Sequence, residues 1–219
     1  MQYLHLATIP VVPNDDNLIL LAEKAALEQL ASVLQPAELA FLRQSAATGV
    51  NAYFFPQAER AVFVRLLEPA TGPANDLEVI RLEANNLLRE LGNYQLESVT
   101  LRSFCDDTRA LAFLEGLMLG NYQFLNYVTD PQKRANRLQQ LRWAHEQAPE
   151  TAVAELNSLV QAVFKTRDMV NEPHSHFDAL KLADAAREAG QTYGFSVEVL
   201  GKKEIENLKM GGLLAVNQA

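Results

Sequence analysis

Residue types that could perform chemistry are few in this chain, and they are scattered. The nearest approach to a metal site is the pair His174 and His176, which follows Glu172 closely. Imidazole and carboxylate groups ligate divalent ions, but a metal site needs three or four ligands, and nothing nearby supplies the rest. The sequence therefore favours structural or solvent-exposed roles for both histidines. His5 and His145 stand alone and predict no chemistry.

Cys105 is the only cysteine, so no intrachain disulfide can form, which fits a reducing compartment. Asp106 and Asp107 follow it directly. Neighbouring carboxylates raise the pKa of a thiol, whereas a helix N-terminus lowers it, and the sequence favours a buried or semi-buried, inert cysteine over a nucleophile. The first five residues lack the features of a signal peptide, and no apolar run approaches the ~20 residues of a membrane span. We expect a cytoplasmic protein.

Carboxylate pairs and glycines are the remaining candidates. Pairs of acids occur at 15–16, 106–107 and 204/206, where a loop, a helix cap or a solvated face explains each of them. The segment Met210-Gly211-Gly212 lacks the spacing and the lysine of a P-loop, and no G-x-G-x-x-G occurs. We expect its two glycines to serve a tight turn or close packing. These residues alone predict no catalytic, cofactor-binding or metal-binding position.

Composition excludes several classes of partner. The chain of 219 residues carries a net charge of −8 with a pI near 5.1, which argues against binding to nucleic acid or to an anionic membrane. A hydrophobic content of 48% with 21% charged residues is typical of a globular protein with a real core. The length fits one large domain, or one ordinary domain plus part of another.

Strand and helix patterns alternate along the first 165 residues, which predicts an α/β fold with a mixed sheet flanked by helices. We expect Asn75 or Asp76 to cap one helix and Gly92 to end it in the left-handed conformation. Asp106 and Asp107 are expected to begin another helix. Strands are expected at 2–9, 17–21, 50–55, 61–67, 95–102 and 138–143, and helices at 23–34, 36–48, 76–91, 106–122 and from 149 onward.

The last segment has its own pattern of elements. Asp178 can cap a helix that Gly194 ends, residues 195–199 alternate as a strand does, and a short helix at 203–208 precedes an apolar strand at 213–216. Such a strand normally lies inside a covered sheet, so we expect an open edge and an uncovered apolar surface here. Residues 174–219 are accordingly expected to be partly disordered, repacked or engaged with a neighbouring chain.

Residues 167–173, Arg-Asp-Met-Val-Asn-Glu-Pro, resemble the Arg-Asp-Leu-Val-Asn-x-Pro junction of the leucyl aminopeptidase (cytosol aminopeptidase) family. The similarity continues through 178–200 and 209–216, and a weaker one at 114–124 resembles the family's Glu-Gly-Leu-x-Leu-x-x-Tyr-x-Phe helix. It implies a non-catalytic, macro-domain-like α/β domain at 1–148, a linking helix and junction at 149–173, and an incomplete, truncated α/β start of the catalytic domain at 174–219.

The resemblance also implies a function. Family members are hexameric exopeptidases that use two divalent metal ions, zinc or manganese, to release N-terminal residues from peptides. Their ligand motifs, Gly-Lys-Gly-x-x-x-Asp-x-Gly-Gly and Asn-Thr-Asp-Ala-Glu-Gly-Arg, do not occur here. The expected function is thus the N-terminal portion of such an enzyme, inactive by itself, whose first domain serves assembly and active-site gating. The alternative is a macro-domain-like binding module for ADP-ribose or a related nucleotide.

Overall fold

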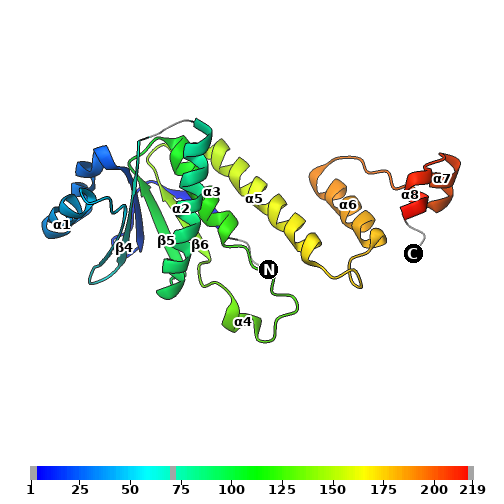
Figure 1. Ribbon diagram of the computed structural model, residues 1–219, viewed down its shortest axis with the longest axis horizontal. Coiled ribbons are helices and arrows are strands. Elements are labelled where there is room, and N and C mark those ends of the chain that lie inside the picture. The colour runs from blue at the N-terminus through cyan, green and yellow to red at the C-terminus, as the bar shows by residue number, and fades with distance from the viewer. Residues whose placement is uncertain (1–3, 70–72, 217–219) are drawn as a thin grey trace. The chain divides into compact units, whose positions relative to one another are not determined.

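The computed structural model describes residues 4–69 and 73–216 (Figure 1). It divides into two compact units, Met1–Thr166 and Arg167–Ala219, which are treated separately below. The division falls inside helix α5 (Glu150–Asn171), so the junction motif is helical up to Asn171. The domain boundaries expected from the sequence, 1–148, 149–173 and 174–219, stay a prediction.

Six strands of the first unit form one mixed sheet. Their order is β1-β6-β5-β2-β4-β3, and only β3 runs antiparallel to its neighbour. Residues 18–22 of β2 are completely buried, as expected for a parallel strand that is covered on both faces. The strands are β1 (His5–Ile9), β2 (Leu18–Glu23), β3 (Ala52–Pro56), β4 (Ala61–Leu67), β5 (Ser98–Ser103) and β6 (Gln140–Ala144).

Alternate side chains of the sheet enter two separate cores. Leu18 and Leu20 of β2 pack with the 3₁₀ helix η1 and with α1, while Ile19 and Leu21 pack with α2, α3 and α5 on the other face. Figure 1 shows the sheet lying between these two groups of helices. The helices are η1 (Lys24–Ser32), α1 (Pro36–Ala46), α2 (Pro73–Asn93), α3 (Asp107–Gly120), the short α4 (Pro131–Arg134) and α5.

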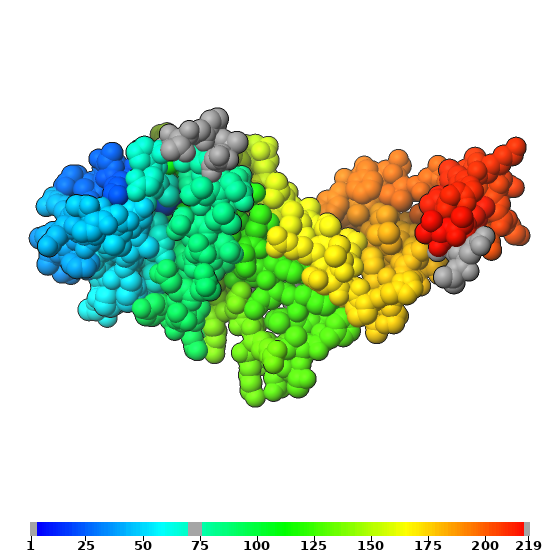
Figure 2. Space-filling model, in the orientation of Figure 1, coloured from blue at the N-terminus to red at the C-terminus, as the bar shows by residue number. Residues whose placement is uncertain are grey.

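Two glycines allow α2 and α3 to approach closely. A Cβ atom at Gly116 would lie 2.3 Å from the carbonyl oxygen of Arg81, and one at Gly120 would lie 2.2 Å from Oδ1 of Asn85. At Gly116 only a hydrogen fits, so the two backbones can nearly touch there, whereas the atoms close to Gly120 belong to the side chains of Asn85 and Leu88. Beyond this crossing the segment 121–138, which contains α4, projects from the surface of the unit (green in Figure 2).

The fold predicted for the first unit is confirmed, with corrections at the ends of elements. Residues 24–32 form a 3₁₀ helix. Helix α2 begins at Pro73, ahead of the expected caps Asn75 and Asp76, and it continues through Gly92. The left-handed residue is instead Gln95 (φ 52°), which turns the chain before β5 and delays that strand to Ser98. The expected loop at 70–72 and the strand start at 2–3 lie outside the described residues.

Described residues of the second unit form helices only: α6 (Ala179–Tyr193), α7 (Lys202–Asn207) and α8 (Gly211–Val216). Both ends of α6 are as predicted. The Asp178 side chain accepts hydrogen bonds from the amides of Leu180 and Lys181 at 3.0 and 2.9 Å, and Gly194 is left-handed with φ 77°.

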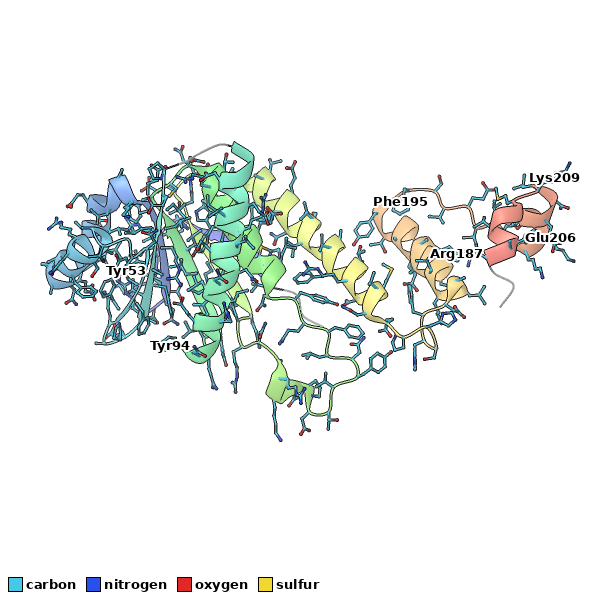
Figure 3. The ribbon with its side chains drawn as sticks, in the orientation of Figure 1. Tyr53, Tyr94, Arg187, Phe195, Glu206 and Lys209 are labelled. Atoms are coloured by element: carbon cyan, nitrogen blue, oxygen red, sulfur yellow. The ribbon has the colours of Figure 1, made fainter. Side chains whose placement is uncertain are left out.

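The two strands predicted for the second unit are wrong. Residues 195–199 form no strand, and 213–216 belong to α8. A strand needs a neighbouring strand for its backbone groups, and a short segment without one satisfies them within a helical turn. The open sheet edge expected at 213–216 is therefore wrong as well, because these residues are helical. Apolar side chains of this unit are nevertheless exposed: Leu180 is 75% exposed and Phe195, labelled in Figure 3, is 53% exposed. The expectation of disorder, repacking or intermolecular contact there stays a prediction.

Candidate functional site at the carboxyl edge of the sheet

The carboxyl ends of β2, β4 and β5 meet at one edge of the sheet. The chain leaves β2 for β4 on one side and then crosses to β5 on the other, so β2 marks a reversal of strand order. Ligands of open α/β sheets bind outside the carboxyl ends of the strands at such a reversal. Topology alone therefore places the candidate site next to Glu23, Glu68 and Cys105.

Arg109 occupies this position. Its guanidinium comes from the first turn of α3 and is held by four hydrogen bonds: Nε and Nη2 donate to the two carboxylate oxygens of Asp76 at 3.1 and 3.0 Å, Nη1 donates to Oε1 of Glu23 at 2.7 Å, and Nη2 donates to the backbone carbonyl of Glu68 at 2.9 Å. Arg109 is only 6% exposed. One side chain thus ties the ends of β2 and β4 to α2 and α3.

The ionisable groups at this edge shift one another's pKa values. Burial lowers the pKa of Arg109, but the hydrogen bonds and the charge of Asp76 outweigh burial, so the pKa is raised and the guanidinium stays charged. Burial of Cys105, assisted by the charges of Glu23 and Asp106 and opposed by Arg109, raises the pKa of its thiol to about 11. A thiol of this pKa is protonated near neutral pH, which agrees with an inert cysteine.

Sequence reasoning missed Arg109, although the sequence holds a signal for it. A positive charge in the first turn of a helix opposes the helix dipole, so its presence there indicates carboxylate partners elsewhere in the fold. Those partners lie 33 and 86 residues away, at Asp76 and Glu23.

The carboxylate pairs singled out from the sequence are not brought together. Asp16 lies at the amino edge of the sheet, where it accepts hydrogen bonds from Thr100 and Arg142. Asp106 caps α3 by accepting from the amide of Arg109, as predicted, and Asp107 contacts Nε2 of His145 at 3.0 Å. Glu204 accepts from the amide of Gly201 at the start of α7. Each of these four acids therefore has a structural role.

The histidines and glycines singled out from the sequence lie in different local settings. His176 forms a hydrogen bond with the adjacent Ser175. The pKa of Asp178 is lowered chiefly by the hydrogen bond from the amide of Lys181, and least by the charge of His174. Gly211 and Gly212 open α8 with nothing within 4 Å of either Cβ position, so the expected close packing there is wrong. The amide of Gly211 does close a tight turn by donating to the carbonyl of Lys209 at 2.8 Å. The left-handed residue in this segment is Lys209 (φ 55°).

Metal ligands are not assembled in the part of the chain that the structure describes. Within residues 4–69 and 73–216 no three His, Cys, Asp or Glu side chains lie together as a metal site requires. The two ions implied by the resemblance therefore have no matching ligand set in these residues. The same residues include no helix long and apolar enough to cross a membrane.

A hollow lies between the free edge of β1 and helix α5. It has a volume of about 790 Å³ and is lined by both elements. Asn157 bridges the two elements: Oδ1 accepts from the amide of Leu6 and Nδ2 donates to its carbonyl, both at 3.0 Å. The bridge satisfies backbone groups that an edge strand otherwise leaves to solvent.

Fold and site together define a class of protein: a three-layer α/β unit whose carboxyl edge is closed by an internal arginine, followed by a helical unit. Residues 164–219 match the model described as "Cytosol aminopeptidase family, catalytic domain". This match supports assignment of the chain to the cytosol aminopeptidase family.

Two curated relatives extend this match. A "Probable cytosol aminopeptidase" of Chlorobaculum parvum is 64% identical over 52 residues, 24% of this chain and 10% of that protein. A protein of the same name from Treponema denticola is 32% identical over 151 residues, 66% of this chain. The chain spans only about a third of the length of that relative, 32%.

Solved structures share the fold at low sequence identity. A tomato leucine aminopeptidase mutant aligns with a TM-score of 0.74 at 15% identity, covering 94% of this chain and 46% of the other. The bottromycin maturation enzyme BotP, in complex with Mn, aligns with a TM-score of 0.65 at 22% identity, covering 88% and 40%. These likenesses support the fold found here.

Proposed function

We propose that this chain is the N-terminal portion of a metal-dependent leucyl aminopeptidase, comprising its non-catalytic domain and the beginning of its catalytic domain. One observation carries the proposal: the match to the catalytic-domain model begins at residue 164, after the complete six-stranded sheet. The intact enzyme releases N-terminal residues from peptides and uses two divalent ions, zinc or manganese. The chain alone is inactive.

The first unit serves assembly and gating of the active site rather than catalysis. Its carboxyl edge, where an α/β domain would hold a ligand, is filled by Arg109 and its acidic partners. Nothing in the described part of this unit offers a phosphate-binding glycine loop. Within the proposal the working oligomer is a homohexamer, and the unit acts at its contacts.

Hydrolysis of leucine p-nitroanilide tests the proposal. The 219-residue chain is assayed with Mn²⁺ and with Zn²⁺, beside a longer form of the same protein that carries the whole catalytic domain. The longer form is expected to turn over substrate only with metal, and the short chain not at all. Metal-dependent turnover by the short chain would show that the active site has been misplaced.

Two further measurements address the role of the first unit. Sedimentation of the longer form is expected to show a large oligomer that a deletion of residues 1–165 disrupts, and an unchanged oligomer would contradict the assembly role.

Calorimetry of the 219-residue chain with ADP-ribose is expected to show no saturable heat. Saturable binding would favour the alternative function of a nucleotide-binding module.

A further inference from the structure

Strand β3 is an edge strand with no charged residue. Within the described residues it pairs only with β4, and its sequence is Ala-Tyr-Phe-Phe-Pro. Unpaired edge strands are templates for another strand, and proteins that avoid such pairing usually place lysine or other charges there. In β3 the only such feature is Pro56, at its end.

Two hydrogen bonds fix which backbone groups of β3 face outward. The amide of Leu66 donates to the carbonyl of Asn51 at 2.8 Å, and the amide of Gln57 donates to the carbonyl of Arg60 at 2.9 Å. Groups facing the partner alternate along an antiparallel strand, so residues 51, 53, 55 and 57 face β4. The amides and carbonyls of Ala52 and Phe54, and the carbonyl of Pro56, therefore point away from the sheet.

Aromatic side chains flank this edge on both faces of the sheet. Phe41 of α1, 56% exposed, lies with its ring 6.4 Å from Tyr53 and 6.3 Å from Phe55. On the other face Tyr94, 47% exposed, stacks on Phe54 at 4.4 Å. Figure 3 labels Tyr53 and Tyr94 at this end of the unit.

We propose that β3 pairs antiparallel with β3 of a second copy of this chain, about a two-fold axis at Phe54. In this register each Phe54 amide donates to the Phe54 carbonyl of the other copy. Each Ala52 amide donates to the Pro56 carbonyl opposite it. Among the described residues, both donors and both acceptors have no other hydrogen-bond partner. The two sheets then continue into one another across the axis.

The side chains fit the same register. Residues whose numbers sum to 108 stand opposite one another, so Phe54 faces Phe54 on one face and Tyr53 faces Phe55 on the other. Aromatic pairs directly across an antiparallel ladder attract one another. A single strand of self-complementary aromatic residues therefore favours a second copy over an unrelated chain.

Charge also favours a second copy of this chain as the partner of β3. Two copies with a net charge of −8 repel each other over most of their surface, so they can approach closely only at a neutral patch. Residues 52–56 carry no charge, and two nearby charged pairs, Arg65 with Glu90 and Arg43 with Glu28, are neutralised within the chain. The contact is small, so the dimer is reversible and depends on concentration.

Sedimentation equilibrium of the whole 219-residue chain tests this pairing with two substitutions at one position. Ala52→Pro removes an outward amide that β4 does not use, so the sheet keeps its ladder while the intermolecular bond is lost. Ala52→Thr keeps the amide and serves as the matched control. The association constant is expected to fall at least tenfold for Ala52→Pro and to stay within threefold for Ala52→Thr.

Hydrogen exchange of the backbone amides of β3 tests the same pairing independently. Protection of the Ala52 and Phe54 amides is expected to rise with protein concentration, whereas the Tyr53 and Phe55 amides, which face β4, are protected at every concentration. The proposal is overturned if the chain stays monomeric up to its solubility limit. It is equally overturned if a dimer forms with the Ala52 and Phe54 amides unprotected, or if Ala52→Pro dimerises as the unsubstituted chain does.

Discussion

The side-chain amide of Asn157 on α5 pairs with both backbone groups of Leu6 in β1, at 3.0 Å in each direction, as a neighbouring strand would. One residue from a helix thereby closes part of the free edge of the sheet. It also attaches α5 to the first strand of the chain.

Replacing Asn157 with alanine should destabilise the first unit by about 1–3 kcal/mol, because it leaves a part-buried amide and carbonyl without partners. Urea unfolding followed by circular dichroism measures the change. Ser158→Ala on the same helix, which removes an exposed hydroxyl bonded to the carbonyl of Ala154, should change stability by less than about 0.5 kcal/mol. Equal effects of the two substitutions would argue against the bridge.

Replacing Arg109 with leucine should cost about 3–5 kcal/mol, since Asp76 and Glu23 would keep their charges without a partner. Arg109→Lys should recover only part of this loss because one ammonium cannot bond both oxygens of Asp76 in the same fork geometry. Arg89→Leu is the matched control, since Arg89 is exposed and, among the described residues, bonds only Asn86. Thermal unfolding that shifts equally for Arg109→Leu and Arg89→Leu would contradict the role given to Arg109.

Two glycines of neighbouring helices should respond in opposite directions to alanine. Gly116→Ala places a methyl group 2.3 Å from the Arg81 carbonyl oxygen and should destabilise by about 1–3 kcal/mol. Gly92→Ala meets nothing within 4 Å inside a continuous helix and should stabilise by about 0.5–1 kcal/mol. The urea unfolding midpoints of both variants test these two opposite changes in stability. Destabilisation by Gly92→Ala would restore the left-handed cap that the sequence suggested.

Alkaline pH should weaken the fold through Cys105. Its pKa is raised in the folded chain to about 11, so the unfolded chain loses the proton first as pH rises. Stability should therefore fall between about pH 9 and pH 11, and the slope should be smaller in Cys105→Ala. Urea midpoints at pH 8, 9 and 10 measure this fall in stability.

At pH 8 the thiol of Cys105 should react with iodoacetamide at least tenfold more slowly in the native chain than in urea, and equal rates would count against burial.

Elements with a strong local signal could be predicted from the sequence. Strand β4 spans 61–67 as expected because its apolar run is bounded by polar residues. Helix α6 begins and ends where Asp178 and Gly194 predict, since both caps act within one turn. The apolar run at 213–216 misled us because β propensity reflects the packing that a neighbouring strand provides, and α8 has none.

The Arg109 cluster could not be predicted from local sequence patterns, because it too depends on segments that are distant in the sequence. The partners of Arg109 come from β2 and α2, and the chain must fold before they meet. Charge patterns in a sequence indicate which acids and bases are available, but the pairing depends on strand order. The register of β3 with β4, in which Phe54 stands opposite Phe63, likewise depends on how the two strands pair in the folded sheet.

The parallel pairing of β1 with β6 has a consequence for synthesis of the chain. The first strand to leave the ribosome is among the last to find its place, because β6 ends at Ala144 and Asn157 follows Leu6 by 151 residues. At the usual speed of translation the strand waits about 8 to 30 s for these partners. During that time β1 is an apolar segment without a sheet, which makes it a natural target for chaperones while the domain is being made.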